Sequence, residues 1–311
     1  MNLRAFTILV AYLGISFSSI TQVQADTAGG QSQKDAIDVM LPQDYISDVP
    51  FEKIGIAALQ VALEFEDIRI PGPKGLDLIV NRAFHRERSH TVRGFGYGWH
   101  LDIPEISVSR KSDPDAPLTY LGCIGYVYSA QFTFNNQYVF PVGFENTNQL
   151  KAGTIASFPD NSIVACENGV PVHINADGIK TIFGKFSGSV GSALNYKPSR
   201  IIDLYGNYID YIYETYTDPT FGYSHLLLKG MTRSDGARID FEFEIVNGKP
   251  WIKRAYYLDR EVQYVHVGLD ARLDQFIDQE NQITSFDYNA IGKITYVKQP
   301  SGLEVTYGWR G

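Results

Sequence analysis

Residues that could carry out chemistry are sparse in this chain of 311 residues. Its six histidines form no His-x-x-x-His pair, and none lies beside a cysteine at the spacing of a zinc site. Residues 184–191 come close to a Gly-x-Ser-x-Gly nucleophile motif, but Ser187 stands where the motif needs its first glycine. The evenly spaced Asp270, Asp274 and Asp278 have no glycine between them, unlike a calcium-binding loop. We therefore predict no catalytic residue, no metal and no cofactor, and we expect the chain not to be an enzyme.

Three glycines at alternate positions, Gly94, Gly96 and Gly98, admit a second chemical interpretation, a loop that cradles phosphate. The dinucleotide-binding fingerprint needs a strand before such a loop and a helix after it. Here the glycines lead to Trp99 and then to Pro104, a sequence that cannot open a long helix. We therefore interpret the glycines as a tight turn into a strand, with Trp99 as a packing anchor.

Composition and charge exclude further classes of partner. The chain carries 27 basic and 35 acidic residues, a net charge of −8, and no long basic run. This balance argues against binding to nucleic acid or to anionic lipid. The short basic stretch at residues 82–93, which also holds His85 and His90, is interpreted as the cover of a sheet face or as a solvated loop.

The first 25 residues have the anatomy of a secretory signal. Arg4 supplies the positive start, residues 5–17 are mostly apolar, and small residues before Asp26 offer a cleavage site. The alternative is a membrane anchor, but the apolar stretch is shorter than the ~20 residues that a bilayer requires. We therefore predict cleavage, no membrane span in the mature chain, and an extracellular, periplasmic or cell-surface location.

Two cysteines, Cys123 and Cys166, remain after this cleavage. An oxidising compartment permits a disulfide between them. The alternative is two buried thiols in separate strands. The distance between their Cα atoms decides the matter, and the sequence alone does not supply it, so both interpretations stand at this point.

The rest of the chain is predicted to be all-β. Residues 26–50 are polar and without periodicity, so we interpret them as a flexible tether. Residues 51–192 form an N-terminal β region with hairpin signals such as Asp177-Gly178. Residues 193–311 form a region of repeated hairpins. Few segments show helical periodicity, and aromatic and β-branched residues alternate with polar ones.

A strand–turn–strand unit occurs four times in that last region. Each copy has a turn residue that tolerates positive φ, followed after three, five and seven residues by side chains on one strand face. In three copies an apolar pair also precedes the turn residue by eight and five positions. The four copies are Gly206 with Ile209, Tyr211 and Tyr213; Gly236 with Ile239, Phe241 and Phe243; Asn281 with Thr284, Phe286 and Tyr288; and Gly302 with Val305, Tyr307 and Trp309.

The aromatic rows of this repeat have two interpretations. Rings such as Tyr211 and Phe241 could be platforms that stack on sugars. Aromatic residues in neighbouring strands also stabilise one another directly. Because the same residue type recurs at the same repeat position, we predict inward packing; a contiguous outward row would instead indicate a glycan-binding surface.

Four patterns occur in a fixed order along the chain. They are the turn and strand at residues 70–78, the Gly-x-Gly-Trp ending of residues 94–99, the Asp-Gly…Phe-Gly hairpin of residues 177–184, and the Asp-x-x-Gly-Asn-x-Ile-x-Tyr-x-Tyr repeat of residues 203–213. Together they resemble the Rhs/YD-repeat family. The resemblance implies a strip of β-hairpins that spirals into a hollow shell, similar to the amino-terminal part of large bacterial insecticidal and virulence toxins.

The same resemblance implies that the shell of complete members encloses a toxic carboxy-terminal domain, which an aspartate-dependent self-cleavage motif releases. This sequence departs from that pattern, because it contains neither segment. The Tyr-Asp pair that names the family is also replaced after Tyr213, Tyr288 and Trp309. We therefore expect shell function and no toxin activity.

Three hypotheses of different classes follow. The first is an exported, non-enzymatic structural module, whose partner is the rest of a larger repeat shell or a second copy joined through the C-terminal edge strand at residues 303–309. The second is a secreted adhesion module that binds carbohydrate, for example surface glycans. The third, an exported hydrolase, has the least support because no nucleophile motif is complete.

Overall fold

The computed structural model describes residues 52–55, 60–85, 94–109, 118–120, 126–128, 131–134, 137–139, 154–158, 160–187, 194–219, 222 and 224–308. The chain divides into two units, Met1–Met40 and Leu41–Gly311, and every described residue lies in the second unit. The expected signal sequence and tether at residues 1–50 therefore lie outside the described residues.

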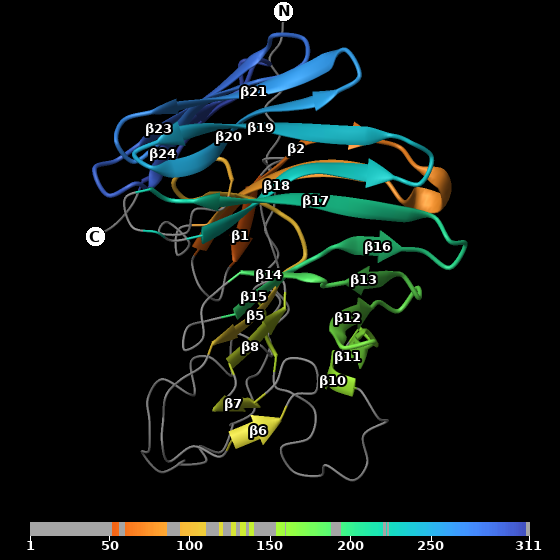
Figure 1. The fold of residues 1–311 in the computed structure, drawn as a ribbon. Helices are drawn as coiled ribbons and strands as arrows, with labels where there is room; N and C mark the ends of the chain where they lie inside the picture. The colour runs from red at the N-terminus through yellow and green to blue at the C-terminus, as the bar shows by residue number, and fades with distance from the viewer. Residues whose placement is uncertain are drawn as a thin grey trace, which may run out of the picture. The chain divides into compact units, whose positions relative to one another are not determined.

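All strand pairs in the described residues are antiparallel, which confirms the all-β prediction. The one helical element within these ranges is a short 3₁₀ turn, η1 (Pro73–Gly75). A four-stranded sheet comes first in the chain (Figure 1). Its strands, in spatial order, are β1 (Glu52–Gly55), β2 (Gln60–Ile70), β3 (Leu78–His85) and β4 (Trp99–Leu101).

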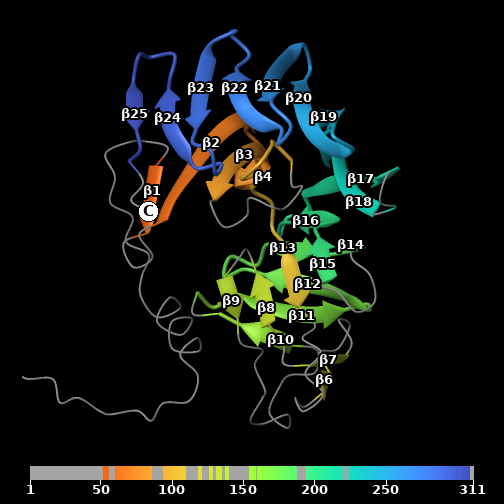
Figure 2. The same ribbon diagram turned by 90° about the vertical axis from the view of Figure 1, so that its left-hand side faces the viewer.

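The largest sheet has 14 strands, and almost every strand pairs with the next one in sequence. Figure 2 shows the later strands side by side as successive hairpins. Because β13 pairs directly with β16, this sheet runs through the expected boundary between residues 192 and 193. Its strands are β10 (Thr154–Ser157), β11 (Ile163–Glu167), β12 (Val170–Ile174), β13 (Lys180–Ile182), β16 (Arg200–Ile202), β17 (Tyr208–Thr217), β18 (Ser224–Arg233), β19 (Arg238–Val246), β20 (Lys249–Tyr257), β21 (Arg260–Val267), β22 (Arg272–Ile277), β23 (Ile283–Tyr288), β24 (Ile294–Lys298) and β25 (Glu304–Thr306).

Two smaller sheets complete the described strands. One has five strands in the order β14-β15-β5-β8-β9, and the other has two, β6 and β7. Their bounds are β5 (Ile106–Ser109), β6 (Leu118–Tyr120), β7 (Tyr126–Tyr128), β8 (Gln131–Phe134), β9 (Gln137–Val139), β14 (Lys185–Ser187) and β15 (Leu194–Lys197).

The four sequence copies have one common hairpin geometry. In every copy the residue five before the turn position pairs with the residue three after it: Ile201 with Ile209, Met231 with Ile239, Phe276 with Thr284, and Val297 with Val305. The turn residue has positive φ in all four, from 60° at Asn281 to 91° at Gly236. Its N–H donates to the carbonyl three residues earlier each time. The sequence repeat is therefore a structural repeat.

The same turn occurs at two positions outside the four copies, Gly178, which the sequence marks as a hairpin, and Gly292. Gly178 donates to the Asn175 carbonyl at 3.0 Å, and Gly292 donates to the Asn289 carbonyl at 3.0 Å. Each asparagine also accepts hydrogen bonds from later backbone N–H groups through its own side-chain oxygen. These side chains fix the turn locally, as is typical of Asx turns.

A β-bulge recurs six to seven residues after the turn position. The ladder shifts register between Ile212 and Tyr213 in β17, and between Glu242 and Phe243 in β19. It shifts again between Asp287 and Tyr288 in β23. Bulges bend a strand and increase its twist, so each of these three copies contains its own bend.

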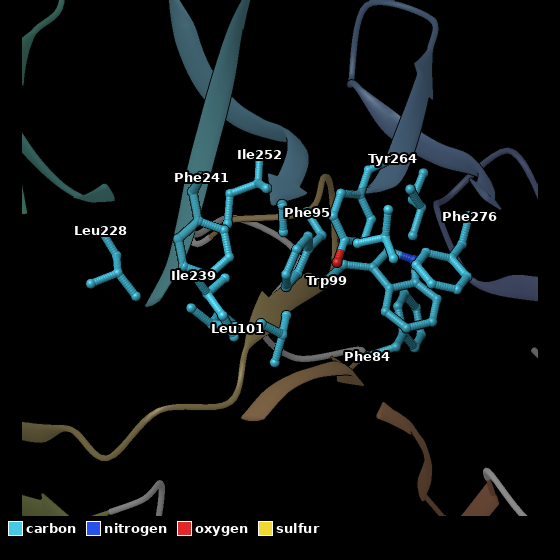
Figure 3. Close-up of a cluster of buried hydrophobic side chains, with 14 of the residues drawn as sticks. Phe84, Phe95, Trp99, Leu101, Leu228, Ile239, Phe241, Ile252, Tyr264 and Phe276 are labelled. Carbon is cyan, nitrogen blue, oxygen red and sulfur yellow. The ribbon is translucent and has the colours of Figure 1, made fainter. Parts of the chain in front are cut away.

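The aromatic rows of the repeat point into the core. Ile209, Ile239, Phe241 and Phe286 are buried, while the remaining described members of the rows pack against the same core. The strands of the four-stranded sheet supply the opposite side of this core, with Leu63 and Leu78 among its members. Phe84 and Trp99, from the same sheet, are labelled in Figure 3. Those remaining row members are Tyr211, Tyr213, Phe243, Tyr288, Val305 and Tyr307. Thr284 is buried as well, and Trp309 lies outside the described residues.

Ile239→Val tests whether this face is the core face. Ile239 is fully buried, so loss of one methylene group is expected to lower the free energy of unfolding by about 0.5–1.5 kcal/mol. The matched control is Ile291→Val at a hairpin turn, where the side chain is 68% exposed and the change is expected to stay within about 0.5 kcal/mol. Urea denaturation of both variants measures the difference; equal losses would contradict this assignment of the core.

Candidate functional site: the seam between two sheets

A fully buried ion pair lies where the four-stranded sheet meets the 14-stranded sheet. The Arg82 guanidinium in β3 donates to both carboxylate oxygens of Asp67 in β2, at 2.9 and 3.0 Å. The two side chains are 0% and 1% exposed. The register between β2 and β3 shifts between Glu66 and Ile68, so Asp67 occupies a bulge. Bulges redirect side chains, and here the bulge turns the carboxylate inward. We call the two sheets' contact around this pair the seam.

Aromatic rings from both sheets surround the guanidinium. From the four-stranded sheet, the Phe65 and Trp99 rings lie 4.6 and 4.7 Å from the Arg82 Cζ atom. From the 14-stranded sheet, Phe276 and Phe286 lie 4.8 and 5.2 Å from it. A cation over ring faces is attracted by the ring quadrupole, most strongly where water is excluded. The Arg82 guanidinium therefore contacts aromatic rings of both sheets and holds the two sheets together.

Tyr264 in β21 completes the polar contacts of the pair. Its hydroxyl donates to Asp67 at 3.0 Å. Burial raises the pKa of the Asp67 carboxyl, whereas the Arg82 charge and the hydrogen bonds from Arg82 and Tyr264 act in the opposite direction. Burial also raises the pKa of Tyr264 well above its ordinary value. Since Arg82 has no exposed surface, it cannot meet a dissolved substrate, and the arrangement serves packing.

The Gly94 to Gly98 segment packs directly beneath the large sheet. Gly94, Gly96 and Gly98 all have positive φ, at 131°, 111° and 81°. The Gly94 carbonyl accepts from the Ile252 N–H at 2.6 Å, and the Tyr97 N–H donates to the Ala271 carbonyl at 3.2 Å. A side chain at Gly96 would place its Cβ 2.5 Å from that Ala271 oxygen. The glycines thus permit a close approach of two backbones.

Trp99 begins β4 directly after these glycines and links the seam to the repeat. Its Nε1–H donates to the Tyr288 hydroxyl at 2.7 Å, and that hydroxyl donates to the Leu273 carbonyl at 2.7 Å. The Trp99 ring also lies 5.0 Å from Phe286 and 5.2 Å from Phe84 (Figure 3). Tyr288 and Phe286 are repeat residues, so the structure brings the predicted strand-start residues and one repeat copy together.

The other predicted residues fall in different places. Cys166 lies in β11 and is disulfide-bonded; Cys123 lies outside the described residues, so its pairing with Cys166 stays a prediction. Arg82 corrects one interpretation: it is not the cover of a sheet face or part of a solvated loop but a fully buried side chain. Sequence analysis also missed Asp67 and Tyr264. The available signal was an acidic residue, Asp67, close to buried strand positions.

Two negative findings concern only the part of the chain that the structure describes. No group of three or more His, Cys, Asp or Glu side chains there is arranged to hold a metal ion. Within the same residues, no helix combines the length and the hydrophobicity that crossing a bilayer requires.

Comparisons with known proteins find similar solved structures but no matching family. No protein-family model and no curated protein matches this chain. Membership of the Rhs/YD-repeat family therefore stays a resemblance.

Among solved structures, the chain is similar to one in the crystal structure of TcdB2-TccC3-TEV, with 12% identity and a TM-score of 0.45 over 86% of this chain. It is also similar to the Photorhabdus luminescens Tc holotoxin pore, with 10% identity and a TM-score of 0.44 over 79% of this chain. A third similar structure is the N-terminal domain of the effector protein SpvB from Salmonella typhimurium, with 13% identity and a TM-score of 0.40.

The shares of these proteins that are matched differ widely. This chain spans 16% of the TcdB2-TccC3-TEV chain and 15% of the holotoxin chain. It covers 100% of the SpvB N-terminal domain, using 78% of its own length.

Proposed function

We propose that this chain is an exported, non-enzymatic wall module of a larger β-hairpin shell. The observation that carries the proposal is the common hairpin geometry of the four copies, in which the same pair of positions meets every time. Repeat proteins extend by adding such units, each of which contacts only its neighbours. Export is supported by the signal-like residues 1–25.

The way in which copies join supports extension through the sheet. Tyr211, five residues after its turn, pairs with Met231, five residues before the next turn. Phe286 and Val297 make the same pair between the third and fourth copies. Tyr307 holds that position in the fourth copy, directly after β25, the last of the described strands in the sheet order. A further unit would therefore place an apolar residue opposite Tyr307.

The inward direction of the aromatic rows favours a structural role over stacking on sugars. Phe241 and Trp251 are almost fully buried, and Tyr211 and Tyr213 pack against the core. The described members of the rows therefore present no contiguous aromatic surface to solvent, and an adhesion module built on them would need such a surface.

Sedimentation velocity of the exported protein tests the proposal. A separate measurement, the intact mass of the exported protein by mass spectrometry, is expected to correspond to a chain that begins at Asp26. An unpaired strand edge recruits other strands, so association is expected to increase with protein concentration. Tyr307→Lys, which places a charge opposite the incoming apolar residue, is expected to suppress it.

The matched control is Tyr205→Lys, at a turn where the ring is exposed to solvent; this variant is expected to associate as the wild-type protein does. Thermal unfolding of Tyr307→Lys checks that the variant is folded. A wild-type protein that stays monomeric at every concentration would contradict the proposal, and so would undiminished association of folded Tyr307→Lys.

A further inference from the structure

A groove with a volume of about 590 Å³ lies between two hairpin turns. The ladder between β19 and β20 ends at the pair Asp240 and Tyr256, before either strand reaches its neighbouring turn. Beyond this pair the two strands diverge. The turn after β18 and the turn after β20 therefore lie apart, with the groove between them. Ile70, at the end of β2, and the following Pro71 line the groove together with these turns. Its volume falls within the range of small-molecule sites.

The groove holds fixed charges of both signs in equal number. Arg233, which is 4% exposed, donates to Asp235 at 2.8 and 2.9 Å and to the Ile70 carbonyl at 2.9 Å. Arg238 donates to Asp240 at 2.8 Å through its Nε atom. Among the described residues of the lining, the charged ones are these two arginines and two aspartates. An anion or a cation would meet a repelling group beside each attracting one, so the groove has no net preference for an ion.

Leu258 forms part of the groove and is unusual on two counts. It is 83% exposed, and its φ is 50°, in the left-handed region that bulky side chains avoid. The equivalent position in the turn between β19 and β20 is Asn247, with a φ of 52°. Asparagine is a residue that such turns favour. Local folding therefore gives no reason for a leucine here, whereas contact with a ligand does.

We propose that this groove binds a neutral saccharide. A sugar ring offers many hydroxyl groups, which need donors and acceptors together, and an apolar C–H face. The exposed Arg238 supplies donors, and Asp235 and Asp240 supply acceptors, in positions that ion pairs fix. Arg233 is buried and donates to Asp235 and to the Ile70 and Leu76 carbonyls, so it holds Asp235 in place. Leu258, Tyr257 and Pro71 supply apolar surface. An extended peptide is a poorer fit, because beyond the Asp240–Tyr256 pair only Arg238, Ile239 and Tyr257 of the two strands lack a ladder partner on the groove side, which is too short an edge for an added strand.

Titration calorimetry of the full mature protein with lactose, maltotriose, mannotriose and chitotriose tests this proposal. At least one of these neutral sugars is expected to bind. Arg238→Ala and Leu258→Asn are each expected to weaken that binding by about tenfold or more. Since asparagine suits a positive φ, Leu258→Asn is expected to unfold at the same temperature as the wild-type protein or a higher one, which separates lost binding from lost folding.

Leu269→Asn is the matched control, because Leu269 is also 83% exposed at a hairpin turn but lies outside the groove lining. It is expected to leave sugar binding unchanged. The proposal is overturned if none of the four sugars binds, or if Leu258→Asn and Arg238→Ala both bind as the wild-type protein does. It is also overturned if Leu258→Asn changes only self-association, since the groove would then be a contact between copies.

Discussion

Asp67→Ala is expected to lower the free energy of unfolding by about 3–5 kcal/mol, the range for removal of one partner from a buried ion pair. The substitution leaves the Arg82 guanidinium fully buried, without its bidentate acceptor and out of reach of solvent. The Tyr264 hydroxyl loses its acceptor as well. Urea denaturation followed by tryptophan fluorescence measures the loss.

The neighbouring residue supplies the control. Glu66 is 43% exposed and pairs with Arg69 on the surface, so Glu66→Ala is expected to cost no more than about 1 kcal/mol. The double variant Asp67→Leu with Arg82→Met removes both charges and is expected to recover much of the stability lost in Asp67→Ala, because no isolated charge remains buried. Similar losses for Asp67→Ala and Glu66→Ala would show that the buried pair does not hold the seam.

Gly96→Ala is expected to destabilise the protein by about 2–5 kcal/mol. A φ of 111° strains any residue with a Cβ atom, at a cost of about 1–2 kcal/mol. The new Cβ would also lie 2.5 Å from the Ala271 carbonyl oxygen, a backbone atom that cannot rotate away. Relief of such overpacking costs a further 1–3 kcal/mol or so.

Gly302→Ala separates the two contributions. Gly302 has a φ of 86°, but no atom lies within 4 Å of the position that its Cβ would take. This variant is expected to lose only the backbone term, about 1–2 kcal/mol. Urea denaturation of both variants gives the two free energies of unfolding. Equal losses would mean that the large sheet accommodates the new Cβ atom at Gly96 without loss of stability.

The features that depend on local sequence were predictable. Side chains at alternate positions and a turn residue with positive φ define a hairpin without reference to distant residues, so the four copies and the inward rows follow from the sequence alone. Asp177-Gly178 is predicted as a hairpin, but the four-copy repeat includes neither Gly178 nor Gly292, and for Gly178 the reason is physical. Around Gly178 the paired positions are His173 and Thr181, which are not apolar, although Asn175 three residues earlier carries the turn signal.

The seam could not be predicted in the same way. Whether Asp67 faces solvent or core depends on one register shift between β2 and β3, and such a shift moves a side chain to the opposite face. Arg82 is buried because the Phe276 and Phe286 rings, from strands far along the chain, close over it opposite Phe65 and Trp99. The contact between Asp67 and Tyr264 likewise joins residues 197 positions apart. No local sequence pattern indicates these long-range contacts. The proposed role of Leu258 could not be predicted from the sequence either, because it depends on the groove that Leu258 lines.

The recurring bulges have a consequence for size. Three copies bend six to seven residues after their turn, so the bend is built into the unit and does not depend on neighbouring domains. A sheet extended by such units turns through a similar angle at every addition. Its radius is then a property of the unit and its circumference is a property of the number of units. A wall built from this hairpin would have its inner diameter fixed before any content is enclosed.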